Sequence, residues 1–245
     1  HLNLLDLTPE FGEFDYIIAH GVYSWVPPAV REKLMAVCKQ NLAPHGVAYI
    51  SYNVYPGWHM LASLRDLMLW HTREIADPLE RVAQARGILQ FMAESVPADS
   101  MGRATLLNAF SKFLIQETER VGPKSDSFLL HDELEEDNQP VYFHEFVEHA
   151  AAHGLQYVAD SLLHSMFVSN LPPGIEGEMA SVRHDGVAVE QYIDVLRNRA
   201  FRMSLLCNDT VRLRGRAPAT TLGELHLAGH FRPCSELDFR SDAEA

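Results

Sequence analysis

Phe14–His20, which reads FDYIIAH, decides the expected fold because it is rich in aromatic and β-branched residues. Such a run predicts a β-strand. Pro27-Pro28 then opens a helix expected from Ala29 to Leu42, since proline is favoured in a first helical turn and apolar residues follow at helical spacing. Val47–Tyr52, which reads VAYISY, predicts the next strand. Strand, crossover helix and strand together indicate a parallel sheet within an α/β fold.

The residues around this unit predict further elements. Leu2–Asp6 is a short apolar run that ends on an acid, and we expect it to be a strand. Three amphipathic helices are expected over residues 61–75, 79–96 and 101–121. Residues 122–139 are acidic and begin with Gly-Pro, so they indicate a linker and the best internal boundary.

The sequence beyond the linker predicts a small α+β module. Pro140 and Gly154 bracket a helix expected over Val141–His153, and a strand is expected at Leu155–Val158. A long helix is then expected from Val189 to Cys207. The last part of the chain mixes strand and turn signals.

Composition limits the classes of partner and compartment. The 245 residues are 47% hydrophobic and carry a formal net charge of -13, which argues against nucleic-acid binding. No apolar run approaches the length of a membrane span. The three widely spaced cysteines form no zinc-binding pattern, so we expect free thiols in a reducing, cytoplasmic compartment.

Longer stretches of the chain resemble a known family. Phe14–Pro27 resembles the fourth strand and following loop of class I S-adenosylmethionine-dependent methyltransferases. Ser51–His59 resembles the end of the fifth strand in a branch that carries a methyltransferase regulatory domain and includes bacterial protein-lysine methyltransferases. The resemblance continues through Asp132–Leu134, Pro140–Ala150 and Glu190–Arg202.

The resemblance implies a domain order and a function. We expect part of a Rossmann-like methyltransferase sheet over residues 1–60, a helical segment over 61–124, and a regulatory domain with a tail over 125–245. The cofactor would be S-adenosylmethionine, the reaction methylation of protein lysine side chains, and the partners a protein substrate and a second copy of the chain. The alternative is a non-catalytic protein-binding or dimerisation module derived from such an enzyme.

The resemblance also implies site residues at the carboxyl ends of the strands, where ligands bind in open α/β sheets. Cofactor contacts would come from Asp6 to the adenine amine, the Leu7 backbone to the ring, and His20 and Gly21 near the sulfonium. The expected catalytic residues are His20, Tyr23 and Tyr52, and the expected substrate-binding residues are Trp25, Asn53, Tyr55 and Trp58. The simpler alternatives are core packing for the aromatic residues, a backbone-satisfied strand end for His20 and a turn for Asp6.

One family feature is absent from the sequence. No Gly-x-Gly occurs, although a glycine-rich turn is what lets backbone approach the methionine and ribose ends of the cofactor. The chain also begins at His1, directly in sequence expected to be a strand. We therefore expect an N-terminally truncated enzyme that is inactive alone and leaves a sheet edge exposed.

Two clusters of polar residues have simple explanations. His149 and His153 are four residues apart on one helix face, whereas His144 points elsewhere, and no HExxH pattern supplies a carboxylate or third ligand. We expect a solvated helix face there and no metal site. Arg197, Arg199 and Arg202 are expected on one long helix, paired with the acidic linker or docking an acidic protein.

Overall fold

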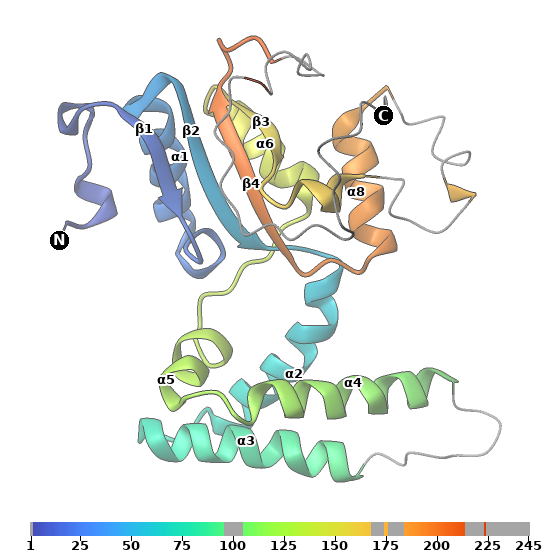
Figure 1. Cartoon of the computed structure of the whole chain (residues 1–245). Helices are drawn as coiled ribbons and strands as arrows, with labels where there is room; N and C mark the ends of the chain where they lie inside the picture. Colours follow the sequence, from blue (N-terminus) through green and yellow to red (C-terminus); the bar gives the residue numbers. More distant parts are fainter. Residues whose placement is uncertain (1, 96–104, 168–173, 176–183, 214–222, 224–245) are drawn as a thin grey trace, which may run out of the picture. The chain divides into compact units, whose positions relative to one another are not determined.

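The computed structural model describes residues 2–95, 105–167, 174, 175, 184–213 and 223 (Figure 1). The chain divides into two units, His1–Val211 and Arg212–Ala245, and every helix and strand below belongs to the first. The start of the helix expected from residue 101 and the last part of the chain lie largely outside the described residues. Among the helices that the structure describes, none is both long and apolar enough to cross a membrane.

Four strands form one mixed sheet. Its order is β1 (Phe14–Ala19), β2 (Leu42–Asn53), β4 (Phe201–Asn208) and β3 (Leu155–Asp160). β1 and β2 are parallel and are connected through α1 (Pro28–Asn41), so the predicted strand–helix–strand unit is confirmed. β4 runs antiparallel to both of its neighbours, which leaves β3 parallel to β1 and β2.

One face of this sheet carries the main core. Figure 1 shows α1 and α6 (Phe143–Ala152) behind the strands, and their apolar residues pack against β2. Ile50 and Met35 are fully buried there. Burial of such a side chain stabilises the fold by roughly 1.5–3 kcal/mol. On β1, by contrast, Tyr16 and Ile18 are 74% and 72% exposed, and β1 is an edge of the described sheet, as expected from the sequence.

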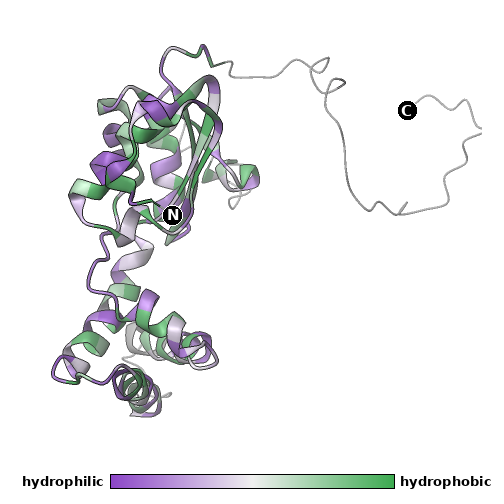
Figure 2. Ribbon diagram, turned by 90° about the vertical axis from the view of Figure 1, so that its left-hand side faces the viewer, coloured by the Kyte–Doolittle hydropathy of each residue, from purple (hydrophilic) through white to green (hydrophobic). Residues whose placement is uncertain are grey.

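The helical segment has a core of its own. α2 (Gly57–Thr72), α3 (Pro78–Ser95) and α4 (Thr105–Val121) bury one apolar stripe each, and Figure 2 shows both hydrophobic and hydrophilic residues on these helices. The acidic stretch after α4 is not an extended linker. It forms α5 (Asp126–Phe128) and the π-helix η4 (Leu129–Glu133), and Leu129 is fully buried in the same core.

Two further sequence predictions about elements are wrong. Leu2–Asp6 is not a strand: the Asn3 side chain accepts a hydrogen bond from the Leu5 amide at 3.1 Å and caps the 3₁₀-helix η1 (Leu4–Asp6). The long helix expected to reach Cys207 ends early, because α8 (Gly186–Leu196) stops before Asn198. Asn198 has φ 46°, a left-handed conformation that turns the chain into β4.

Strands from both sides of the helical segment share the sheet. β4 pairs with β2 from Ala48↔Leu206 to Asn53↔Phe201. The residues expected to form a separate α+β module after residue 124 therefore complete the sheet begun by β1 and β2. The helical segment is an insertion into this α/β unit.

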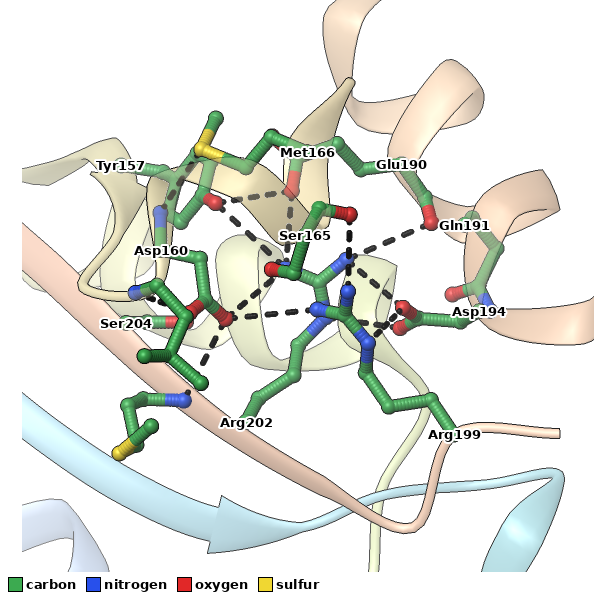
Figure 3. A network of polar contacts seen from close by, with 12 residues as sticks. Tyr157, Asp160, Ser165, Met166, Glu190, Gln191, Asp194, Arg199, Arg202 and Ser204 are labelled. Carbon is green, nitrogen blue, oxygen red and sulfur yellow. Dashed lines mark hydrogen bonds and ion pairs between the residues drawn. The ribbon is translucent and has the colours of Figure 1, made fainter. Parts of the chain in front are cut away.

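A buried arginine holds β4 to the elements around it (Figure 3). The Arg202 side chain is 0% exposed, and its guanidinium donates to both carboxylate oxygens of Asp194, at 2.7 and 2.9 Å. It donates to Glu190 at 2.9 Å and to the Tyr157 hydroxyl at 3.4 Å. Its Cζ atom lies 3.7 Å from the centre of the Phe143 ring. One side chain thus joins β4 to α8, β3 and α6.

The neighbouring arginines act in the same region. Arg199 forms ion pairs with Asp194 at 3.1 Å and Asp160 at 3.4 Å, and Arg197 donates to the Ser165 carbonyl at 2.6 Å. The prediction that these residues share one long helix and pair with the acidic stretch is wrong. In the described residues their partners lie on α8, on β3 and in the turn after β3.

Asp194→Asn should lower the free energy of unfolding by about 3 kcal/mol. The amide keeps the shape but leaves the buried guanidinium partly uncompensated, and breaking a buried pair is strongly destabilising. Urea unfolding followed by circular dichroism measures the change. The control is Glu74→Gln, the same replacement at an acid whose side chain is 82% exposed in its pair with Arg73. It should stay within about 0.5 kcal/mol, and equal effects would contradict the role given to Asp194.

Candidate functional site

A cavity of about 340 Å³ opens beyond the carboxyl ends of β1 and β2. The two strands are parallel, so the loops that follow them meet at one edge of the sheet. The loops and helices around it contribute eleven lining residues: His20, Gly21, Trp25, Asn53, Trp58, Leu61, Arg120, Phe128, Asp132, Glu133 and Phe201. Five of these were predicted from the sequence as site residues, namely His20, Gly21, Trp25, Asn53 and Trp58.

Hydrogen bonds to β2 hold the loop that follows β1. The Gly21 amide donates to the Ser51 hydroxyl at 2.8 Å, and His20 Nδ1 lies 3.2 Å from that hydroxyl and 2.9 Å from the Tyr49 hydroxyl. Gly21 has φ 65°, a conformation that glycine adopts without steric penalty. Side chains of β2, and not backbone groups, therefore satisfy His20 through Nδ1. This leaves Nε2 as the ring nitrogen able to face a ligand.

A buried serine fixes the next turn of the same loop. Ser24 is fully buried, and its hydroxyl accepts a hydrogen bond from the Asn53 amide at 2.9 Å. Its carbonyl accepts from the Gln139 amide at 2.8 Å. This anchoring positions Trp25 against Trp58 in an edge-to-face pair with ring centres 6.0 Å apart. Two indoles thus form one wall of the cavity.

α4, α5 and η4 of the helical insertion contribute further lining residues, Arg120, Phe128, Asp132 and Glu133, to which sequence reasoning assigned no site role. Arg120 of α4 forms ion pairs with Glu117 at 2.7 Å and with Glu133 of η4 at 2.8 Å. Asp132 stands beside Glu133 on the cavity, and burial raises the pKa of its carboxyl. A π-helix such as η4 is rare and often marks functional sites. Its sequence carries no signal that would have predicted it.

The remaining predicted residues are not among those that line the cavity. Tyr23 and Tyr52 are 2% and 1% exposed, and their hydroxyls bond to His149 and Ser204 in the core. Burial raises the pKa of Tyr23 to about 12 and that of Tyr52 well above its usual value, so both phenols stay neutral at physiological pH. The structure assigns these two tyrosines to core packing, the simpler of the alternatives that their sequence allowed.

Three further predicted residues lie elsewhere at the surface. Tyr55 stacks on His59 with ring centres 4.1 Å apart. Asp6 and Leu7 end η1, which lies against α1. The exposed Asp6 does not end a strand, so the geometric reason for placing it against an adenine ring is lost.

The geometry suits a small cationic or apolar group more than a whole nucleotide. The cavity offers aromatic side chains, the Asp132 carboxyl, the Arg120–Glu133 ion pair and one histidine, which suit the reactive end of a sulfonium cofactor and a side-chain acceptor. No glycine-rich turn lines it. The residues present therefore fit the methyl-transfer end of S-adenosylmethionine, and no described group fits its methionine and ribose ends.

Ser24→Ala should destabilise the chain by about 1–3 kcal/mol, because the Asn53 amide then loses its partner in a buried position. Chemical unfolding measures the loss. Ser63→Ala is the matched control, since the Ser63 hydroxyl bonds an exposed helix carbonyl at 2.6 Å. A loss no larger for Ser24→Ala than for the control would show that the loop is not anchored there.

Comparison with known proteins finds a matching domain model and similar sequences. Residues 125–208 match the model of a predicted methyltransferase regulatory domain. The chain is 37% identical to the uncharacterized protein RP789 of Rickettsia prowazekii over 247 residues, and the match covers 100% of the chain and 43% of that protein. The uncharacterized protein sll1526 of Synechocystis is 25% identical over 91% of the chain and 42% of its own length. The chain thus spans less than half of each of these two relatives.

The fold is similar to that of a solved enzyme. PKMT2 from Rickettsia typhi superposes with a TM-score of 0.75 at 35% identity, covering 90% of the chain and 40% of PKMT2. PKMT2 in complex with AdoHcy, the demethylated form of S-adenosylmethionine, gives the same TM-score at 36% identity. Residues 125–208 thus resemble a methyltransferase regulatory domain, and most of the chain is similar in sequence and fold to part of PKMT2.

Proposed function

We propose that the chain is part of a methyltransferase that modifies lysine side chains of proteins, and that the cavity beyond β1 and β2 holds the lysine beside the methyl donor. One observation carries this proposal: five residues that the sequence suggested as site residues converge on a single cavity. The similarity to PKMT2, a protein lysine methyltransferase solved with AdoHcy, supports the class of acceptor.

The indole wall suits methyl transfer. The reaction is an in-line displacement, so the protein mainly orients the acceptor and excludes water. Trp25 and Trp58 both line the cavity, and aromatic faces attract a methyl group that carries positive charge. Asn53 adds a fixed polar group. Its backbone N–H donates to the Ser24 hydroxyl, and its side-chain Nδ2 donates to Asn138 Oδ1 at 3.1 Å.

The polar lining of the cavity suits a lysine ammonium. Asp132 brings negative charge to the cavity and so attracts the cation, while Glu133 is paired with Arg120, which also lines the cavity. An acceptor lysine must then lose its proton, and an apolar cavity favours the neutral amine. We propose His20 Nε2 as the acceptor of that proton, because His20 lines the cavity and its Nδ1 is occupied by the Tyr49 and Ser51 hydroxyls. Since both acids lie within residues 125–208, this regulatory segment would also help to select the acceptor.

The chain alone should bind the cofactor weakly and transfer no methyl group. Its sequence has no Gly-x-Gly turn, and the cavity fits only the reactive end of the cofactor. The longer relatives have more residues than this chain in which to carry a cofactor clamp. If the chain instead belongs to a non-catalytic binding or dimerisation module, neither this chain nor a lengthened version should transfer a methyl group. That outcome would distinguish the module from the enzyme.

Two thiols in the described part of the chain, which does not include Cys234, fit the compartment that we propose. Cys38 and Cys207 are free and buried, and burial raises the pKa of both. Unpaired cysteines are typical of reducing compartments, so the cytoplasm remains our proposal.

Calorimetric titration with AdoHcy tests the division of the cofactor site. We expect no binding tighter than about 1 mM to this chain, equivalent to roughly 4 kcal/mol. A version lengthened by the preceding segment of its relatives should bind at micromolar concentration. Micromolar binding by the short chain would show that the cofactor clamp is complete within it.

Transfer of a radioactive methyl group by the lengthened protein tests the acceptor site. Trp25→Ala should lower kcat/KM at least tenfold, because the indole wall orients the acceptor. Trp70→Ala removes the same side chain from an indole that is 62% exposed on α2 and does not line the cavity, so it should leave kcat/KM unchanged. Label should reach a lysine-rich protein and be lost when its lysines are acetylated. Label that persists on acetylated protein would refute a lysine acceptor without refuting methyl transfer.

A further inference from the structure

Three metal-binding side chains meet where α1 packs beside α6, away from the proposed methyl-transfer cavity. Glu32 of α1 reaches two histidines at the end of α6. Its Oε1 atom lies 3.1 Å from His149 Nε2, and its Oε2 atom lies 2.9 Å from His153 Nε2. One ligand atom of each residue falls within 4.8 Å of the other two.

This cluster supplies what the sequence lacked. His149 and His153 share a helix face, but without a carboxylate they offered only two ligands. The fold brings Glu32 from a distant part of the chain, and the histidine side chains are only 19% and 21% exposed. The predicted solvated helix face is therefore a half-buried contact between two helices.

The environment of His149 points to a missing ligand. Its Nε2 atom is buried and has no hydrogen-bond partner, since the nearby Glu32 oxygen is not aligned for a hydrogen bond. Its Nδ1 atom lies 2.8 Å from the Tyr23 hydroxyl. Metal-bound histidines almost always use the second ring nitrogen in such a bond, which fixes the ring and its tautomer. A proton on Nδ1 leaves the Nε2 lone pair directed at the cluster.

We propose that Glu32, His149 and His153 form a binding site for a divalent transition-metal ion, with Zn²⁺ as the metal. Two imidazoles and one carboxylate are ligands that zinc prefers, whereas magnesium and calcium favour oxygen ligands alone. Three protein ligands leave a fourth position for water. In a tetrahedral site with bonds of about 2.0–2.1 Å, neighbouring ligand atoms are roughly 3.3 Å apart. The three candidate atoms lie within 4.8 Å of one another, so the side chains need only draw together to hold the ion.

The metal would have a structural role and would link α1 to the end of α6. No HExxH carboxylate stands beside the histidines in the sequence, so the site lacks the general base of a zinc hydrolase. Both helices cover the same face of the sheet, and Tyr23 connects His149 to the loop that carries Trp25. Binding of the ion would stabilise this face of the fold and steady the loop.

Titration of the untagged, chelator-treated chain with Zn²⁺ tests the site. We expect one equivalent to bind at micromolar concentration or tighter and, at a hundredfold excess over Kd, to raise Tm by roughly 5 °C. Co²⁺ in its place should give the intense visible absorption of a tetrahedral ion. Glu32→Gln and His153→Gln, both at partly exposed side chains, should lower the affinity at least tenfold and abolish the shift in Tm.

Two further variants separate a built site from chance binding by the 13 histidines of the chain. His45→Gln removes an exposed histidine outside the cluster and should leave the affinity unchanged. Tyr23→Phe should weaken binding roughly tenfold while the four-coordinate Co²⁺ spectrum persists. Zinc affinity that is the same in the chain, Glu32→Gln and His153→Gln would overturn the proposal and leave the cluster an ion pair.

Discussion

The fold depends on the burial of one positive charge in the middle of a sheet. Arg202 lies on β4, between two strands that run opposite to it, and its side chain has no exposure to water. Removing a guanidinium from water is costly unless carboxylates and hydrogen bonds replace the solvent. Burial lowers the pKa of Arg202, but its bonds to Asp194 outweigh that effect and leave the pKa above its usual value. The arginine therefore stays charged, and α8 and β3 must stay in place around it.

The burial also acts on its acidic partners. Burial raises the pKa of Asp194 and Glu190, and the nearby Arg202 charge offsets only part of the rise. Each group is thus tolerated inside the protein only in the presence of the others. Such mutual dependence favours a single arrangement of β3, β4 and α8 over alternatives in which one element shifts.

The sequence predicted the elements whose signals are local. The strand at Phe14–Ala19, the proline-initiated α1 and the start of α6 follow from composition and periodicity over a few residues. The central strand β4 was missed because its residues continue the apolar spacing of α8, and only the left-handed Asn198 separates them. The acidic stretch was read as a linker because charge dominates it, although the few leucines within it pack into the helical core.

In the candidate site, too, residues with local sequence signals were predictable and residues placed by helix packing were not. Residues at the ends of β1 and β2 were predictable because parallel strands place their following loops together, and Trp25 and Asn53 do meet there. Tyr23 and Tyr52 sit on the same segments but point to the other side, which strand alternation and loop anchoring decide. Arg120 and Asp132 could not be predicted, since their position depends on how separate helices pack. The same holds for Glu32, whose histidine partners are distant in sequence.

The two ends of the helical insertion leave the sheet side by side. Val54 and Val141 form a bridge, and backbone bonds of 3.1 and 3.2 Å tie Val141 to Tyr55 and Asn53. The residues at the two ends of the insertion are hydrogen-bonded to each other. A change in the length or composition of the insertion therefore need not disrupt the sheet. Because the same insertion carries Trp58, Arg120 and Asp132, a change of insertion would alter this part of the cavity lining while the residues at the strand ends are retained.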